Sequence, residues 1–542
     1  MSERPPRVAW GLYQRCAIAG VVIVFLTAAA VSTAALLKIK SDVSGPISKY
    51  GHKVAFKPDV ITRADAGKPQ TLLLVGSDRR YGAGRHAANS DTLMLVRLDP
   101  DQQATAVMSV PRDLVVDIAG VGRAKINSAY AHGGLGLTTS TVKTLLTFPG
   151  EAFKINHAVG VNFKGFRRAV DYIHCVYTDV DRRYYHSNLG LPPSQQYAEI
   201  DIQPGYQQLC GQDALDYVRH RHQDNDFVRA ARQQSFLRDA KDQVGTSGLL
   251  SNLKDLVTIF AKSTESDSDL GSTTGILRLL KLAAFSAGHP VRQVQFPGVS
   301  VNAAPVAQAA TAGGTGTGTG TGAATSPASG QTGAIAGLGD YVTADPAKIQ
   351  AAVGEFLHGK VATKRPRVAK VRTRRSSRRP RSSSRPQDYG LVDARSAGLT
   401  MAAGARRLSS LPLYFPGWLT PKGQFPRSTT QAPMPHLYTL RDRAGRPHAA
   451  YRVVVAEDVT QGQFYGVQGT TWRSPPILAK ASAGPPVRLG GRSFRVDYDG
   501  KRIRLIAWRT PRAVYWVANT LDRTLTNRQM LGLARSLTRR GA

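Results

Sequence analysis

The chain has 542 residues, which is too long for one ordinary domain and indicates roughly three or four units. Hydrophobic residues make up 42% of the sequence, enough for a sizeable packed core, and the formal net charge is +35. A charge of this size suggests nucleic acid, a membrane surface or an anionic polymer as a partner.

The first element in chain order is an uncharged apolar segment, residues 16–37. A helix of this length can cross a hydrocarbon core of ~30 Å. Arg4, Arg7 and Arg15 precede the segment, so we expect residues 1–15 to remain in the cytoplasm. A cleaved signal peptide is the alternative, although the apolar run is longer than usual for one. The sequence therefore predicts a single-pass protein of the cell membrane with most of its chain extracytoplasmic, and nucleic acid becomes a poor partner.

Shifts in composition divide the remaining chain into four parts. Residues 38–67 show no periodicity and are expected to form a stalk, and residues 68–358 form the main domain. Within that domain, residues 302–339 are rich in Ala, Gly and Thr and predict a disordered insertion. A basic linker at 359–388 then leads to a smaller α+β domain at 389–542.

Three apolar runs near the start of the main domain predict strands: TLLLV from Thr71, TLMLVRL from Thr92 and ATAVMSV from Ala104. If they form an antiparallel meander, the end of the first, the start of the second and the end of the third share one edge of the sheet. That edge would gather five charged residues: Asp78, Arg79, Asp91, Arg112 and Asp113.

The residue types at this edge suit a phosphate ester with a bound metal. Carboxylates bind Mg²⁺ or Mn²⁺ together with phosphate oxygens, and arginines hold phosphate through paired hydrogen bonds. Ordinary surface salt bridges at strand ends are the alternative. The next motif, KINSAYAHGG, places Lys125 and Asn127 on one face if the chain there is extended.

The segment YVRHRHQDNDFVRAARQQ, from Tyr217 to Gln234, concentrates arginines. Arg219 and Arg221 face the same side only in an extended chain. Asp226 can cap a helix that carries Arg229 and Arg232 on one face. Four arginines directed at one point require a strongly anionic ligand such as a pyrophosphate, whereas a solvated basic helix would explain only the last two.

Two cysteines of the exported part, Cys175 and Cys210, are expected to form a disulfide bond, because exported chains seldom keep free thiols. Two buried thiols are the alternative. The sequence contains no Gly-x-x-x-x-Gly-Lys-Ser/Thr loop, no Gly-x-Ser-x-Gly motif and no His-Glu-x-x-His motif. These absences disfavour an NTPase, a serine hydrolase of that type and a zinc peptidase.

At the end of the main domain, Asp345-Pro346 predicts the start of an amphipathic helix. Twelve Lys or Arg residues and no acid lie between 360 and 385, and this linker either grips anionic polymer or lipid, or is only a solvated spacer. In the last domain, Asp499-Gly500 predicts a β-hairpin, and a terminal helix is expected after Asn527. Three aromatic residues could stack on sugars or belong to the core: Phe464, Tyr465 and Trp472.

In this order, the motifs resemble those of the LytR-CpsA-Psr family of cell-wall glycopolymer ligases. The matching pieces are TLLLVGSDRR, NSDTLMLVRLDP, MSVPRDLVVDI, KINSAYAHGG, VNFKGFRRAVD, ALDYVRHR and RAARQQSFL. The resemblance implies an α/β (α+β) fold with a mixed central sheet, flanking helices and an apolar groove for a polyprenyl chain.

The resemblance also implies roles for single residues. Asp78 and Asp91 would hold Mg²⁺ or Mn²⁺, and the catalytic group would comprise these two residues with Arg112 and Asp113. The residues implied for pyrophosphate binding are Arg79, Arg112, Lys125, Asn127, Arg219, Arg221, Arg229, Arg232 and Gln233.

The implied reaction moves a glycopolymer from a polyprenyl-pyrophosphate carrier to a peptidoglycan sugar hydroxyl in a bacterial cell wall. Two other functions stay open. One is a lipid-pyrophosphate hydrolase that uses water as acceptor, and the other is a non-catalytic protein that anchors wall polymer through its basic linker and last domain.

Overall fold

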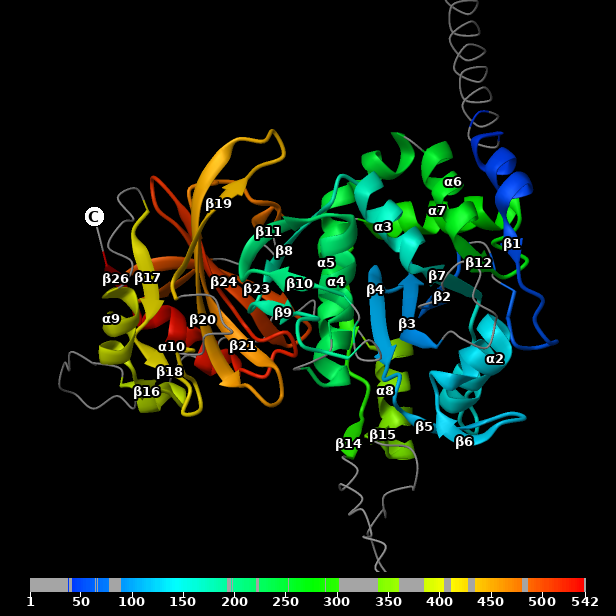
Figure 1. Ribbon diagram of the computed structural model, residues 1–542, viewed down its shortest axis with the longest axis horizontal. Helices are drawn as coiled ribbons and strands as arrows, with labels where there is room; N and C mark the ends of the chain where they lie inside the picture. The colour runs from blue at the N-terminus through cyan, green and yellow to red at the C-terminus, as the bar shows by residue number, and fades with distance from the viewer. Residues whose placement is uncertain are drawn as a thin grey trace, which may run out of the picture.

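A computed structural model describes the chain in two sheet-based units that lie side by side (Figure 1). The described residues are 38, 41–63, 65, 67–77, 89–192, 196, 198–220, 224–251, 253–287, 289–301, 340–359, 385–403, 411–426, 434–479 and 486–540. The predicted span at 16–37, the predicted insertion at 302–339 and most of the basic linker lie outside these ranges. Within them, no helix is both long and apolar enough to cross a membrane.

A seven-stranded mixed sheet forms the centre of the main domain, as predicted. Strand β2 pairs antiparallel with β3 and parallel with β7, and β3 pairs antiparallel with β4, which confirms the predicted meander. The strands in spatial order are β1 (His52–Lys53), β12 (Thr264–Ser266), β7 (His157–Asn162), β2 (Gln70–Ser77), β3 (Ser90–Asp99), β4 (Ala104–Val110) and β13 (Val291–Val294).

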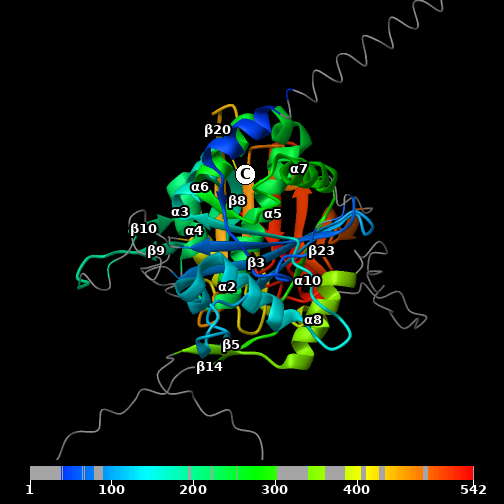
Figure 2. The ribbon, with the colours of Figure 1, turned by 90° about the vertical axis from the view of Figure 1, so that its right-hand side faces the viewer.

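The apolar residues of β2 alternate between two helical layers, because successive side chains of a strand point to opposite faces. Leu73 and Val75 pack with α2 (Ser128–Leu146) and α8 (Pro346–His358). Leu74 packs on the opposite face with α6 (Leu253–Ser263) and α7 (Thr273–Ala287). Figure 2 shows these two helical layers below and above β3. Helices therefore cover both faces of the sheet. Ligands can approach the sheet only where its strands begin and end.

The segment expected to be a stalk is instead part of the fold. Residues 41–50 are helical, and β1 pairs in parallel with β12. Val43 and Ile47 are four residues apart, so they share one face of this helix, and both are buried against α6 and α7. The polar residues between them concealed this short apolar stripe.

A second lobe of the main domain carries the arginine-rich segment. The predicted disulfide bond between Cys175 and Cys210 is present. It joins the start of β8 (Val176–Val180) to the start of α4 (Gly211–Arg219), and α5 (Asp226–Ser251) follows. The lobe also contains α3 (Phe163–Tyr172), β9 (Tyr184–His186), β10 (Ile200–Ile202) and β11 (Gly205–Leu209). Four short strands lie elsewhere in the main domain: β5 (Val115–Ile118), β6 (Gly122–Lys125), β14 (Val299–Val301) and β15 (Tyr341–Thr343).

The C-terminal unit is built on an antiparallel sheet. Its strands in spatial order are β19 (His436–Arg441), β20 (Pro447–Asp458), β21 (Gln463–Thr470), β25 (Val514–Ala518), β24 (Arg502–Arg509), β23 (Arg492–Asp499) and β22 (Val487–Leu489). The remaining elements are η3 (Pro386–Tyr389), β16 (Val392–Asp393), α9 (Arg395–Ala403), β17 (Leu413–Pro416), β18 (Trp418–Leu419), η4 (Pro476–Leu478), α10 (Asn527–Arg535) and β26 (Leu537–Arg540).

The local predictions for this unit agree with the structure. The Asp499-Gly500 turn joins β23 to β24, and Gly500 has the positive φ of 57° that favours glycine. The terminal helix begins at Asn527, with Thr526 as its cap. Phe464 and Tyr465 are buried, which excludes the two residues as a sugar-stacking surface.

The two units share a buried interface. Tyr177 and Tyr206 of the main domain pack with Trp516 of the C-terminal sheet. Asp179 accepts hydrogen bonds from Arg452 (3.0 Å) and from the Trp516 indole (3.0 Å). A buried guanidinium with a paired carboxylate fixes how the units meet, because separating them would leave buried charge unpaired.

Candidate anion-binding site

The candidate site lies at the edge of the sheet where β2 ends, β3 begins and β4 ends. Ser77 pairs with Ser90 at this edge, and Asp91 is the next residue of β3. Arg112 and Asp113 follow the end of β4, which pairs with β3 through Leu93 and Val110. Asp78 and Arg79, which were also predicted here, lie outside the described residues.

Arg112 links the two carboxylates of this edge. Its Nη1 lies 2.5 Å from Asp91 Oδ1, and its Nε lies 3.6 Å from Asp113 Oδ2. Lys125 Nζ lies 3.5 Å from the other oxygen of Asp113. The side chains of these four residues are only 11% to 24% exposed, so their charges are partly shielded from water and interact more strongly than at an open surface.

The first turn of α5 is attached to the same cluster. The backbone N–H of Arg112 donates to Asp226 Oδ2 (2.9 Å), and Arg229 Nη2 donates to Asp226 Oδ1 (2.7 Å). Asp226 therefore bridges the two arginines, and Asn225 caps the helix in its place by accepting from Val228 N (2.9 Å).

Arg229 is almost fully buried at this junction. Burial lowers the pKa of Arg229, Asp226 opposes the change, and the neighbouring Arg112 acts in the same direction as burial. The carboxylates of Asp91 and Asp113 also oppose this lowering, so they offset the repulsion between the two guanidinium groups.

Asn127 and Gln233 join the surrounding elements to the site. The Asn127 N–H donates to the Arg112 carbonyl (3.1 Å), and its own carbonyl accepts from Ser90 N (3.4 Å). Gln233 Nε2 donates to Thr92 Oγ1 (2.9 Å) and to the Val218 carbonyl (3.1 Å). Gln233 thereby ties α5 to β3 and to α4.

Arg219 belongs to a helix and not to an extended chain. It is the last residue of α4, and the chain leaves the helix at His220. Its guanidinium stacks over the Phe163 ring at 4.1 Å from the centroid. Arg221 lies outside the described residues, so the shared direction of Arg219 and Arg221 stays a prediction.

Arg232 is separated from this cluster, contrary to the expectation that it faces the same ligand as Arg229. It is completely buried, pairs with Asp224 and donates to the His220 carbonyl (2.5 Å). Asp224 also pairs with Arg182, and the Arg232 guanidinium lies over the Tyr184 ring. Arg232 therefore holds the segment between α4 and α5.

Asp224 and Arg182 were missed by sequence reasoning. Burial alone raises the pKa of Asp224, but the charges of Arg232 and Arg182 outweigh it and hold that pKa below its usual value. The sequence signal for Asp224 was an acidic residue between two pairs of arginines, Arg219/Arg221 and Arg229/Arg232. Arg182 lies more than 40 residues from Asp224, and no sequence signal connected it with this segment.

The donor chemistry of the edge fits a hard cation beside an anion. Asp91 supplies carboxylate oxygens next to Arg112, and Mg²⁺ prefers such oxygens together with those of phosphate. Elsewhere in the described ranges, one group of acidic and cysteine side chains has metal-like spacing: Asp171, Cys175 and Cys210. Its two cysteines are joined in the disulfide bond.

Fold and site together define an α/β protein with a partly buried cluster of arginine, lysine and aspartate side chains at one sheet edge. The LytR_cpsA_psr family model matches residues 30–312, which is just over half of the chain. The chain therefore belongs to the LytR_cpsA_psr family.

Several curated relatives are named polyisoprenyl-teichoic acid–peptidoglycan teichoic acid transferase TagU. The protein of Bacillus cereus is 30% identical over 203 residues, which cover 37% of this chain and 60% of that protein. The protein of Halalkalibacterium halodurans is 34% identical over 184 residues, which cover 33% and 55%. The chain thus spans about three fifths of the length of these relatives.

Solved structures of low sequence identity also align with the chain. Bacillus subtilis TagV is 22% identical, with a TM-score of 0.39 over 54% of this chain and 97% of that one. The LytR-CPS2A-psr family protein YwtF (TagT) with bound octaprenyl pyrophosphate is 21% identical, with a TM-score of 0.36 over 57% and 98%.

Proposed function

We propose that this protein is a phosphotransferase that moves a glycopolymer from a polyprenyl-pyrophosphate carrier to a peptidoglycan sugar hydroxyl. The observation that carries the proposal is the position of Arg112, which lies between Asp91 and Asp113 with Arg229 beside it. Family membership and the name of the TagU relatives support the same reaction.

The reaction exchanges one phosphorus–oxygen bond for another. The sugar hydroxyl attacks the phosphorus that carries the glycan, and a phosphodiester bond to peptidoglycan forms. The bond between this phosphorus and the bridging oxygen of the pyrophosphate breaks, and polyprenyl monophosphate leaves. The hydroxyl proton passes to a carboxylate of the cluster, Asp91 or Asp113.

The basic side chains lower the barrier by stabilising negative charge. Arg112, Arg229 and Lys125 neutralise the charge that accumulates on the phosphate oxygens. Together with Asp78, Asp91 would hold Mg²⁺ or Mn²⁺, which supplies further charge neutralisation on those oxygens. Gln233 and Asp226 position the helix and strand that carry these groups.

We further propose that residues 16–37 anchor the protein in the cell membrane, with the two units on the extracytoplasmic side. A polyprenyl chain stays in the bilayer, so an anchored enzyme meets its lipid-linked substrate at high local concentration. An apolar groove of the main domain would receive the polyprenyl chain.

The test is release of polyprenyl monophosphate by the full chain in detergent, supplied with a polyprenyl-pyrophosphate-linked glycan. Release that requires peptidoglycan and a divalent cation supports the proposal. Release with water as the sole acceptor would identify a hydrolase. Tight lipid binding without release in any condition would favour a wall-anchoring protein and contradict the transferase.

A further inference from the structure

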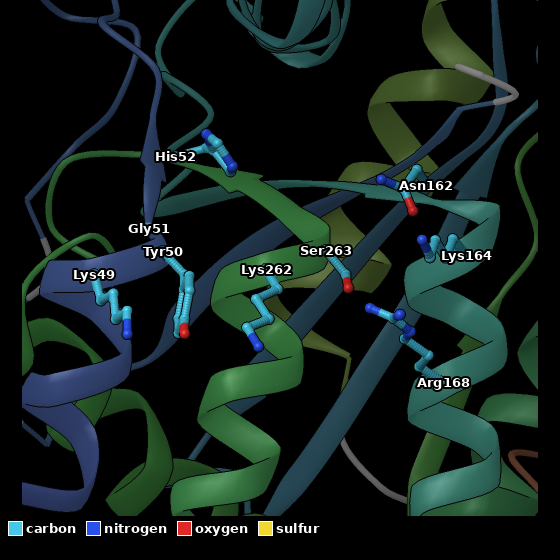
Figure 3. Close-up of a pocket in the computed structure, with 9 residues that line it drawn as sticks. All are labelled: Lys49, Tyr50, Gly51, His52, Asn162, Lys164, Arg168, Lys262 and Ser263. Carbon is cyan, nitrogen blue, oxygen red and sulfur yellow. The ribbon is translucent and has the colours of Figure 1, made fainter. Parts of the chain in front are cut away.

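A second basic site lies on the same edge of the central sheet, away from the Arg112 cluster. It is a cavity of about 440 Å³ between the helix at 41–50, α3 and α6. Figure 3 shows the residues that line it. They are Lys49, Tyr50, Gly51, His52, Asn162, Lys164, Arg168, Lys262 and Ser263.

Close helix packing brings the basic side chains together. Gly165 of α3 lies against Ser263 of α6, where an added Cβ would come within 2.5 Å of the serine Cβ. This approach sets Arg168 opposite Lys262, and Figure 3 shows the Arg168 guanidinium pointing towards Ser263. A larger residue at 165 would separate the two helices and widen the cavity.

Tyr50 gathers two lysines on the other wall. The ammonium groups of Lys49 and Lys262 lie 5.3 and 4.3 Å from the centre of its ring. Hydrogen bonding with Lys49 and the charge of Lys262 lower the pKa of Tyr50. The ring therefore holds two cations from different elements near each other, at a cost in mutual repulsion that an anion would remove.

The charge of the cavity is of one sign. Among the described residues that line it, four are lysine or arginine and none is acidic. A volume of this size accommodates a phosphate and its immediate substituents, and single-sign walls raise the local concentration of an opposite charge.

The position of the cavity favours a lipid headgroup as the source of the phosphate. Lys49 and Tyr50 end the helix at 41–50, which follows the proposed membrane anchor by only a few residues. Asn162, at the cavity, pairs with Ser77 of the active-site edge. The next residue, Phe163, carries the stacked Arg219.

We propose that this cavity binds the phosphate of an anionic phospholipid headgroup and turns the active-site edge towards the bilayer. The inference rests on the proposed membrane attachment. Basic groups next to a membrane contribute roughly 1 kcal/mol each to attraction for anionic lipid, which corresponds to about fivefold in affinity per group.

The test is binding of water-soluble dihexanoyl phosphatidylglycerol to the full chain in an uncharged maltoside detergent, followed by ³¹P NMR titration. The Lys49→Gln/Lys262→Gln variant removes two cavity charges. The Lys68→Gln/Lys154→Gln variant removes two exposed charges elsewhere and is the matched control. Dihexanoyl phosphatidylcholine and inorganic phosphate are titrated in parallel.

We expect phosphatidylglycerol to bind at least about tenfold more weakly to the cavity variant, with wild-type binding in the control variant. Equal loss in both variants, or equal binding of phosphatidylcholine, would overturn the site. Inorganic phosphate that binds as tightly as phosphatidylglycerol would overturn the lipid assignment. The assay contains no glycan and no peptidoglycan, so its outcome is separate from that of the transferase proposal.

Discussion

At the scale of single residues, Arg112 occupies the centre of the site because its side chain and backbone serve different partners. Its guanidinium faces Asp91 and Asp113, while its N–H and carbonyl bind Asp226 and Asn127. The backbone contacts fix where the side chain begins, so the guanidinium is preorganised before substrate arrives.

Replacing Arg112 with lysine tests the geometry separately from the charge. Lysine keeps the positive charge but lacks the planar fork that binds two phosphate oxygens. We expect kcat/KM for polyprenyl monophosphate release to fall about 100-fold, the usual cost of one lost donor in such a site. Arg123→Lys, at an exposed position of β6, is the control. Wild-type kcat/KM in Arg112→Lys would show that charge alone suffices.

A second prediction concerns the buried Asp224, which pairs with Arg182 and Arg232. Asp224→Asn removes the carboxylate that both buried guanidinium groups share, and we expect the free energy of unfolding to fall by about 3–5 kcal/mol. Chemical denaturation followed by circular dichroism measures this change. Asp117→Asn, at an exposed strand position, should change it little.

The same carboxyl predicts acid sensitivity. Because its folded pKa is below the usual value, Asp224 stabilises the fold above an unfolded pKa of about 3.9, and this contribution is lost as the pH falls below it. The wild-type advantage over Asp224→Asn should therefore shrink at low pH. A difference that stays constant down to pH 2 would contradict the ion-pair explanation.

Residue roles could be predicted from the sequence only in part. The grouping of Asp91, Arg112 and Asp113 followed from three neighbouring strands. The apolar runs of the sequence were enough to predict where these strands begin and end. Arg229 and Arg232 are equivalent by helical spacing and are both buried, yet Arg229 pairs with Asp226 beside the Arg112 cluster and Arg232 pairs with Asp224. The environment of Arg232 differs because its partner Asp224 also pairs with Arg182, which comes from a distant part of the chain.

At the scale of elements, the disulfide bond is expected to hold α4 in place. It joins cysteines 35 residues apart, and α4 runs from this bond to Arg219. The Cys175→Ser/Cys210→Ser variant should lose about 2–4 kcal/mol of unfolding free energy, since the crosslink restricts the unfolded chain. Denaturation of the wild-type protein with and without reductant gives an independent measure. No change in either experiment would contradict a stabilising role.

Elements defined by local sequence agree with prediction, whereas those defined by distant partners do not. The β2–β4 meander, the β23–β24 hairpin and the Asp345 cap of α8 each depend on residues close in sequence. The helix at 41–50 was missed, because its burial depends on α6 and α7 more than 200 residues later.

At the scale of the whole molecule, the C-terminal unit is joined to the main domain by buried charge as well as by aromatic packing. Arg238 of α5 pairs with Asp499 (2.7 Å), and the neighbouring Asp239 interacts with the charge of Arg504. Since α5 also carries Arg229, the C-terminal unit supports the helix that supplies the site.

Asp239 makes this interface sensitive to pH. Burial raises the pKa of Asp239 to about 6, although Arg504 opposes the change. The pKa of Asp239 is therefore higher in the folded chain, about 6, than in the unfolded chain, about 3.9. Its contribution to stability is fully present below about pH 3.9 and is lost as the pH rises through about 6.

Asp239→Asn removes this titration and should flatten the dependence of unfolding free energy on pH between about 4 and 6. Relative to the wild type, the variant should gain about 1–3 kcal/mol on going from pH 4 to pH 7. Asp117→Asn, at an exposed strand position, is the control. Identical pH profiles for wild type and Asp239→Asn would contradict the assignment.

The most direct test of the transferase is the chemical bond that it leaves on the wall. The full chain is incubated with a polyprenyl-pyrophosphate-linked glycan and peptidoglycan, and the products are quantified by mass spectrometry. The proposed reaction predicts equal amounts of polyprenyl monophosphate and of glycan joined to peptidoglycan through a phosphodiester, both lost in Arg112→Ala. Free glycan phosphate in place of the phosphodiester product would contradict it.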